Sequence, residues 1–214
     1  MTPRIAVVDY GAGNLRSISR AIDVAGGEAF VASTGKDLLI ADAIVLPGVG
    51  HAGAAMARMQ ELGIVDVLKH RVVDGAPFFG VCLGMQLLFG DQEEGGGTGL
   101  GILSGRVRAL PSSVKAPQIG WNRAQFVKPG LLESDRREED YYFVHSFVAE
   151  DVALDDIAAV TSYGGVFPSV VKHGVIWGTQ FHPEKSSVAG IDLLRRWISI
   201  VPTSTKFAAK SVTS

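Results

Sequence analysis

The only cysteine of this chain, Cys82, lies in the pentapeptide Gly80-Val81-Cys82-Leu83-Gly84, between an apolar run and a helix-like run from Met85 to Phe89. Glycines two residues before and after it let the backbones crowd at a sharp strand-to-helix turn, so the thiol projects beside a helix N-terminus. Backbone amides and the helix dipole there favour the thiolate, which is the reactive form. The pattern predicts a nucleophile, although a lone cysteine is also commonly a small buried apolar residue.

His182 and Glu184 stand on either side of Pro183, late in the chain. A proline biases the preceding residue toward an extended backbone, and residues two apart in an extended segment point to the same side. Glu184 is therefore expected to bind one ring nitrogen of His182 and to stabilise the imidazolium, while the other nitrogen faces a thiol. Taken singly, these residues also fit a strand-end histidine and a solvated surface acid. Together with the earlier elbow cysteine they predict a catalytic triad of Cys82, His182 and Glu184.

Acyl chemistry at a thiol also needs N–H donors for the oxyanion. An elbow supplies one from the residue after the nucleophile, here the amide of Leu83. The second is predicted at Val49, because the glycines of Pro47-Gly48-Val49-Gly50 let a peptide turn toward the thiol. An ordinary glycine-rich turn before a helix fits the same residues.

The chain has 214 residues, of which 47% are hydrophobic, and a formal net charge of −2. This is enough apolar material for one globular domain, predicted over residues 1–201. The near-neutral charge leaves no electrostatic footprint for nucleic acid or for an anionic membrane. No apolar stretch approaches the about 18 residues that a membrane span needs, and no secretory segment is recognised near Met1. A single cysteine forms no internal disulfide, so a cytoplasmic protein is expected.

Short apolar runs alternate with amphipathic segments in the first half of the chain, as strands and crossover helices do in a mostly parallel sheet. Strands are predicted over 5–8, 28–32, 43–46 and 78–81, and helices over 15–25, 52–62 and 64–72. Cys82 then lies at the carboxyl end of a strand, where open α/β sheets place their sites.

After residue 90 the pattern becomes β-rich, and the glycines between Gly95 and Gly101 predict a flexible loop. Strands are predicted over 106–110, 118–126, 141–149, 158–163, 169–173 and 175–181, and a last helix over 191–201. We therefore expect an α/β fold, with a mostly parallel central sheet flanked by helices and a C-terminal antiparallel β extension. Residues 202–214 show no apolar period and are predicted to be a disordered tail.

Three segments resemble the signatures of the class I, triad-type glutamine amidotransferases: Pro47 to Gly50, Gly80 to Gln86, and Phe181 to Ser187. Two further segments, Pro117 to Asn122 and Tyr141 to Phe147, are similar to those of the glutaminase subunits of imidazole glycerol phosphate synthases. The resemblance runs from Ile5 to about Trp197, and it implies the fold of the class I amidotransferases.

The resemblance implies a reaction in which Cys82 attacks the side-chain amide of L-glutamine and His182 protonates the leaving ammonia. Water then hydrolyses the glutamyl thioester to glutamate. Residues that match the substrate-binding positions of the family are Gly50, Gln86, Glu94, His145, Ser146 and Phe147. A carboxylate at Glu94 suits the ammonium group of glutamine, although Glu94 also fits a solvated loop acid.

The same resemblance implies a partner, because ammonia must reach a second active site before bulk water protonates it. In the family that partner is the (β/α)₈ cyclase subunit of imidazole glycerol phosphate synthase, joined in a heterodimer that serves histidine biosynthesis. The residues expected at the interface are Asn14, Trp121, Asn122, Tyr142 and Lys185. Tryptophan and tyrosine are enriched in interface cores, but a helix cap, core aromatics and a solvated charge would explain most of these residues equally well.

No cofactor and no metal are expected. His51, His70 and His173 lack metal-ligand spacing and are expected to face solvent or to cap helices. The run Gly11-Ala12-Gly13-Asn14 lacks the third glycine of a dinucleotide fingerprint. Two other functions stay open: a different amidotransferase of the class, such as that of vitamin B6 or anthranilate synthesis, and a non-enzymatic subunit with a vestigial elbow. The segments around Trp121 and His145 argue against the first, and the complete triad argues against the second.

Overall fold

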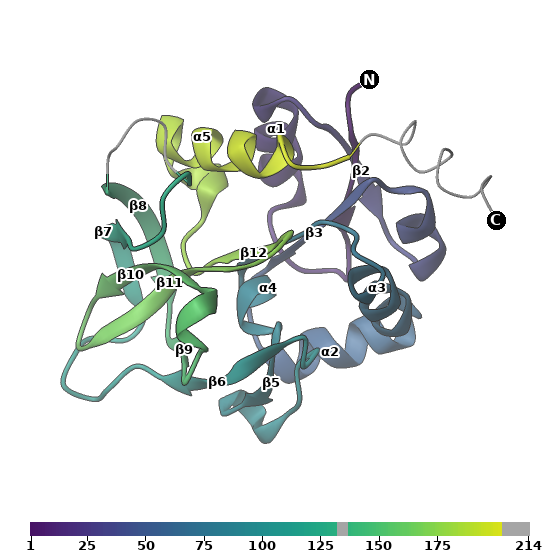
Figure 1. Ribbon diagram of the computed structural model, residues 1–214. Helices are drawn as coiled ribbons and strands as arrows, with labels where there is room; N and C mark the ends of the chain where they lie inside the picture. Colours follow the sequence, from purple (N-terminus) through teal and green to yellow (C-terminus); the bar gives the residue numbers. More distant parts are fainter. Residues whose placement is uncertain (132–136, 203–214) are drawn as a thin grey trace.

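A long mixed sheet organises the computed structural model, which describes residues 1–131 and 137–202 (Figure 1). Among these residues, nine strands pair in the order β2-β1-β3-β4-β12-β11-β10-β7-β8. The strands of this sheet that pair in parallel are β1 (Arg4–Val8), β2 (Glu28–Ala32), β3 (Ala43–Gly48), β4 (Phe78–Cys82) and β12 (Ile176–Thr179). The predicted parallel core of the fold is thus confirmed.

Helices cover both sides of the parallel strands (Figure 1): α1 (Leu15–Ala25) and α5 (Ser187–Ile198) lie on one side, α2 (Ala52–Glu61) and α3 (Ile64–Val73) on the other. Successive strand residues point to opposite faces. In β1, Ile5 and Val7 therefore belong to the core under α1 and α5, whereas Ala6 and Val8 belong to the core under α2 and α3. Burial on both faces explains why these strands are continuous apolar runs. Over the two described ranges, no helix is long and apolar enough to cross a membrane.

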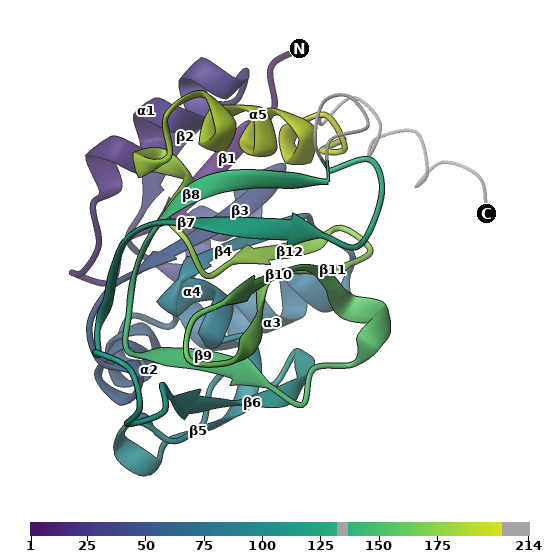
Figure 2. The ribbon, with the colours of Figure 1, turned by 90° about the vertical axis from the view of Figure 1, so that its left-hand side faces the viewer.

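Antiparallel strands extend the same sheet, and a second, smaller sheet of mixed pairing is present (Figure 2). The extension contains β7 (Gln118–Phe126), β8 (Glu138–His145), β10 (Ile157–Ser162) and β11 (Val166–His173). The smaller sheet contains β5 (Phe89–Gln92), β6 (Leu103–Ala109) and β9 (Phe147–Glu150). The predicted antiparallel extension is confirmed.

Several predicted element bounds are wrong. The single strand predicted over 141–149 is two strands, because the chain changes sheets at Ser146: His145 pairs in the large sheet and Phe147 in the small one. The helix-like run after Cys82 is a short helix, α4 (Leu83–Gln86), and Phe89 already starts β5. This run is apolar and buried on every side, so its periodicity does not distinguish helix from strand.

Short 3₁₀ helices were not predicted. They are η1 (Gly35–Ile40), η2 (Glu94–Gly96), η3 (Leu154–Asp156) and η4 (Pro183–Lys185). The second of these forms part of the predicted flexible glycine loop. Apart from Pro202, the predicted disordered tail lies outside the described residues.

Candidate active site

Cys82 ends β4 and turns directly into α4 with the strained backbone angles φ 54° and ψ −108°. The lack of room for a side chain explains why glycines stand at positions 80 and 84. A Cβ atom on Gly80 would lie 2.5 Å from the carbonyl oxygen of Gly84, and a Cβ atom on Gly84 would lie 1.8 Å from the carbonyl oxygen of Leu46. Only glycine therefore lets this corner close against β3. The predicted strand-to-helix elbow is present.

Cys82 is only 6% exposed, and its thiol lies among polar groups. Its Sγ atom donates to the carbonyl oxygen of Val144 at 3.7 Å and accepts from Nε2 of Gln180 at 3.7 Å. Gln180 is fully buried, and its Oε1 atom accepts from Nε2 of Gln86 at 3.1 Å. Gln86 in turn donates to the carbonyl oxygen of Phe147 at 2.8 Å. Sequence reasoning missed Gln180, although it stands only two residues before His182, directly after the strand Ile176–Thr179.

His182 and Glu184 follow β12, the neighbour of β4 in the sheet. Because β4 and β12 are parallel, their carboxyl ends meet at one edge, which brings the histidine segment to Cys82. Nδ1 of His182 lies 2.8 Å from Oε1 of Glu184, and the two side chains are only 3% and 5% exposed. Nε2 of His182 is buried and has no hydrogen-bond partner. The predicted contact between histidine and carboxylate is therefore present, and the second ring nitrogen is free.

The electrostatics around His182 favour its charged form. Burial, the largest effect, lowers the pKa of the imidazole, but the neighbouring Cys82 sulfur and the Glu184 carboxylate raise it. The net result is a pKa raised from 6.5 to about 9. His145 behaves in the opposite way, since burial lowers its pKa to about 4. His182 is therefore an imidazolium at neutral pH, whereas His145 is neutral.

A cavity of about 460 Å³ opens above the elbow. It is lined by Val49, Gly50, His51, Cys82, Leu83, Gln86, Glu94, Pro117, Val144, His145, Ser146 and Phe147. This set contains the nucleophile and every residue predicted for the oxyanion hole and for substrate binding. Sequence reasoning missed His51, Pro117 and Val144 as lining residues, although Pro117 and Val144 lie in the two segments that resemble those of the synthase glutaminases.

Contacts within the chain link two sides of the cavity. Oε2 of Glu94 accepts from the backbone N–H of Ala52 at 2.7 Å and so caps the start of α2. His51 precedes α2, as expected of a helix-flanking residue, and its ring packs against Gly95, where a Cβ atom would lie 2.3 Å from the ring. The carboxylate predicted to bind the substrate ammonium therefore holds the end of the glycine-rich segment that begins at Pro47.

The predicted oxyanion donors lie on both sides of the nucleophile. The register of β3 and β4 pairs Gly48 with Cys82, so Val49 follows directly beside the elbow. Leu83 is the first residue of α4. Gly50 adopts φ 93°, a left-handed conformation that explains the glycine after Val49.

Three of the predicted interface residues form a cluster at the surface. Trp121 is 57% exposed and contacts Tyr142 edge to face, with ring centroids 6.2 Å apart. Nζ of Lys185 lies 5.9 Å from the centre of the Tyr142 ring. A tryptophan this exposed is not part of the hydrophobic core, so core packing does not explain Trp121.

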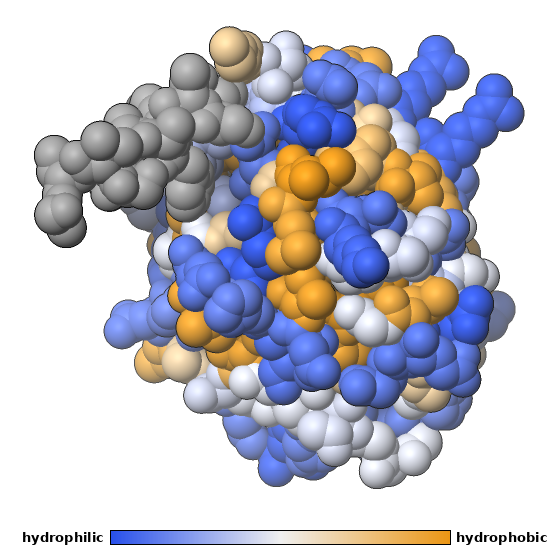
Figure 3. All heavy atoms as spheres, turned by 90° about the vertical axis from the view of Figure 1, so that its right-hand side faces the viewer, coloured by the Kyte–Doolittle hydropathy of each residue, from blue (hydrophilic) through white to orange (hydrophobic). Residues whose placement is uncertain are grey.

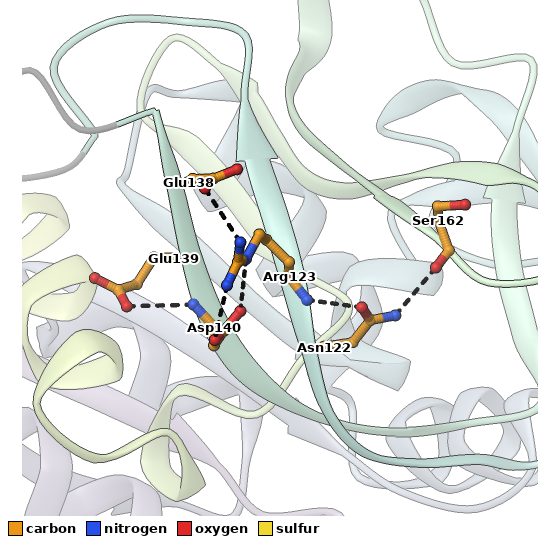
Figure 4. A network of polar contacts seen from close by, with 6 residues as sticks. All are labelled: Asn122, Arg123, Glu138, Glu139, Asp140 and Ser162. Carbon is orange, nitrogen blue, oxygen red and sulfur yellow. Dashed lines mark hydrogen bonds and ion pairs between the residues drawn. The ribbon is translucent and has the colours of Figure 1, made fainter.

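The two predicted interface asparagines have partners within the chain. Oδ1 of Asn14 accepts from the backbone N–H of Ser17 at 3.2 Å and caps α1. The side chain of Asn122 donates to the carbonyl oxygen of Ser162 at 3.1 Å and accepts from the backbone N–H of Arg123 at 2.7 Å (Figure 4). Both side chains therefore have a structural role, whatever else they contact.

Metal-ligating side chains do not cluster: within residues 1–131 and 137–202, no group of three could hold an ion. His70 lies 3.2 Å from Asp74 on α3, and His173 lies 2.8 Å from Asp156. These histidines form pairs with single carboxylates at the surface.

Comparison with known families matches residues 6–199 to the family described as glutamine amidotransferase class-I. The chain belongs to this family. Among the relatives of this amidotransferase, a protein named imidazole glycerol phosphate synthase subunit HisH from Methanothermobacter thermautotrophicus is 43% identical over 198 residues, which cover 92% of this chain and 98% of the relative. A protein of the same name from Moorella thermoacetica is 39% identical over 199 residues and covers 92% and 95%.

Solved structures agree with the fold of this amidotransferase. PurLQS from Thermotoga maritima superimposes with a TM-score of 0.71 at 20% identity, over 93% of this chain and 97% of that chain. At this identity the similarity supports the fold alone. The amidotransferase fold expected from the sequence is confirmed.

Proposed function

We propose that this chain is the glutaminase subunit of an imidazole glycerol phosphate synthase, which hydrolyses L-glutamine and passes the ammonia to a (β/α)₈ cyclase subunit. The observation that carries the chemistry is the buried pair of His182 and Glu184 beside Cys82, which is the member of the triad that lines the cavity. Relatives of that name, similar over nearly their whole length, support the identity of the subunit. A single domain over residues 1–201 accounts for the activity, and a reducing cytoplasm suits its catalytic thiol.

The reaction takes place in two steps on Cys82. The thiolate attacks the side-chain amide carbon of glutamine, the C–N bond breaks, and the imidazolium of His182 gives its proton to the departing ammonia. The neutral His182 then removes a proton from water, which attacks the thioester. The C–S bond breaks, and glutamate and the thiolate result. Glu184 fixes the ring through Nδ1 and stabilises the imidazolium.

Both steps pass through a tetrahedral oxyanion, which the backbone N–H groups of Val49 and Leu83 stabilise. Glu94 binds the ammonium group of the substrate at the far side of the cavity. Gln86 and residues 145–147, which also line the cavity, hold the rest of the amino acid. We propose no cofactor for this reaction, because its chemistry needs only a thiol and a base, and the chain supplies both.

The cyclase subunit binds the face of β7 and β8 beside the cavity. Trp121 and Tyr142 form the aromatic centre of this face and Lys185 adds a cation, and Asn14 and Asn122 are the other two residues proposed to contact the partner. Exposed aromatic residues next to a catalytic cavity are typical of interface cores. Ammonia released at the thiol then leaves toward the bound partner and not toward bulk water.

Strand β8 links this docking face to the catalytic residues. The carbonyl oxygen of Tyr142 accepts from the backbone N–H of His182 at 2.9 Å, and that of Val144 accepts from Sγ of Cys82 at 3.7 Å. A partner that repositions β8 therefore changes the surroundings of both groups. We expect weak glutaminase activity of the isolated chain and a large rise when the cyclase binds together with its substrate, a phosphoribulosyl-formimino nucleotide.

The decisive experiment measures glutamate release by the chain alone, with the cyclase subunit, and with the cyclase subunit and its phosphoribulosyl-formimino nucleotide. Activity should rise with each addition, and Cys82→Ala should abolish it in all three mixtures. Hydrolysis by the Cys82→Ala complex at the wild-type rate would exclude the proposed nucleophile. Equal turnover by the isolated chain and the full complex would exclude the proposed dependence on the partner.

A further inference from the structure

Tyr10 carries a buried hydroxyl group that the reaction above does not use. It lies just after β1, whose register with β3 (Val7 opposite Val45) brings it beside the end of β3. Tyr10 is only 4% exposed, and its Oη atom has no hydrogen-bond partner. A buried hydroxyl without a partner costs about 1–3 kcal/mol, so its presence needs an explanation.

The neighbours of this hydroxyl are the proposed oxyanion loop and the nucleophile. A Cβ atom on Gly48 would lie 2.7 Å from Oη, so the hydroxyl packs directly on the Gly48 backbone. The pKa of Tyr10 is raised well above its ordinary value, first by burial and then by the nearby Cys82, while the backbone N–H of Val49 lowers it. The hydroxyl therefore stays protonated, and the Val49 N–H lies near it without making a hydrogen bond of normal geometry.

We propose that Tyr10 is a positioning residue for the oxyanion loop, and that its hydroxyl donates to the carbonyl oxygen of Gly48 when the Val49 N–H turns toward the substrate. This inference rests on the proposed glutaminase function. A peptide plane that rotates about its Cα–Cα axis exchanges the directions of its N–H and C=O groups. Gly48 packs against Oη, and the Val49 N–H is close enough to lower the pKa of Tyr10, so rotation of the peptide between them puts the Gly48 carbonyl near the hydroxyl and gives its proton an acceptor.

The loop has the freedom that such a rotation requires. Gly48 has no side chain, Gly50 already adopts φ 93°, and the Val49 side chain is 43% exposed. Turning this peptide therefore displaces no core side chain. The hydroxyl has no acceptor before the peptide turns and gains one afterwards. It therefore favours the turned arrangement, in which the oxyanion hole is complete.

The test is Tyr10→Phe, which removes the hydroxyl and keeps the ring, measured in the complex with the cyclase subunit and its nucleotide. The kcat for glutamate release should fall about three- to tenfold, the value of one hydrogen bond, with KM unchanged. The isolated variant should resist urea at least as well as the wild type, because it loses a buried group without a partner. Alkylation of Cys82 by iodoacetamide should keep its rate, since that displacement forms a C–S bond, releases iodide and creates no oxyanion.

Thr161→Val is the matched control, because Thr161 has another buried hydroxyl without a partner, in β10 and outside the cavity lining. This variant should show the same or greater stability with wild-type kcat. A wild-type kcat in Tyr10→Phe, or a loss of kcat that parallels a loss of stability, would overturn the role of Tyr10. If the wild-type complex itself released no glutamate, the proposed function would fail instead, so the two failures are distinguishable.

Discussion

At the scale of single residues, the charge on His182 depends on a balance between opposing effects. Burial alone would leave the imidazole neutral, since an isolated charge is costly in a nearly dry site. Cys82 and Glu184 outweigh that cost and raise the pKa to about 9. The imidazolium is thus available at neutral pH to protonate the leaving ammonia.

This balance predicts a pH limit for the glutaminase reaction. As the pH rises through about 9, His182 loses its proton and kcat should fall. In Glu184→Gln the carboxylate no longer raises the pKa while burial still lowers it, so the alkaline limb should move to lower pH. The same variant should lose about 100-fold in kcat, because the ring loses its orienting partner.

The measurement is a pH profile of glutamate release by the reconstituted complex. Asp156→Asn is the control, because Asp156 pairs with His173 at the same distance of 2.8 Å outside the cavity lining. Its profile should match that of the wild type. An unchanged alkaline limb in Glu184→Gln would contradict the role assigned to the carboxylate.

At the scale of elements, the elbow works because three backbones meet without side chains between them. The end of β3, the end of β4 and the start of α4 approach so closely that a Cβ atom on Gly84 would lie inside the contact distance of the Leu46 carbonyl. Both strands are central in the sheet, and their backbones are held by neighbours on either side. The corner therefore cannot relax by moving one element.

Gly84→Ala should accordingly destabilise the chain by about 3 kcal/mol or more, a loss typical of severe overpacking. Gly165→Ala is the control, since no atom lies within 4 Å of the Cβ position there and its φ is not left-handed. The control should remain within about 0.5 kcal/mol of the wild type. Urea unfolding of the isolated chains measures both, and equal stability of the two variants would show that the corner is not tightly packed.

At the scale of the whole molecule, exposed apolar residues occur at both ends of the large sheet. Trp121 is 57% exposed on β7, next to the edge strand β8. Ile40 is 58% exposed on η1, which packs against α3 and the opposite edge strand β2. On the face that carries α3, hydrophobic side chains are interspersed with hydrophilic ones (Figure 3). The Trp121 end adjoins the cavity, because Val144 of β8 lines it.

Position next to the cavity therefore predicts which end binds the cyclase. Trp121→Ala should weaken binding about tenfold or more, as the loss of a central aromatic does in protein interfaces. Ile40→Ala, with nearly the same exposure, should bind as the wild type does. Titration calorimetry of both variants with the cyclase subunit tests this, with unfolding curves to show that neither variant loses stability. Weaker binding of Ile40→Ala alone would place the interface at the other end of the sheet.

Much of the site follows from local sequence. The glycines around Cys82 determine a corner by excluding side chains. Pro183 follows an extended His182 as predicted, but Glu184 reaches the ring from the 3₁₀ helix η4 and not from an extended segment. The parallel part of the fold is equally local in origin, because strands buried on both faces must be continuously apolar. These features depend on residues within a few positions of one another.

The tertiary structure decided which distant segments come into contact, and local sequence patterns do not contain this information. Pairing of β12 with β4 brings His182 to Cys82, and pairing of β1 with β3 brings the hydroxyl of Tyr10 to the oxyanion loop. The division between β8 and β9 at Ser146 has the same origin, because a strand changes sheets in response to distant partners. The sequence by itself therefore determined which groups could react, through local geometry and residue type. Only long-range strand pairing decided which of them meet, since that contact is made between segments whose separation along the chain carries no local signal.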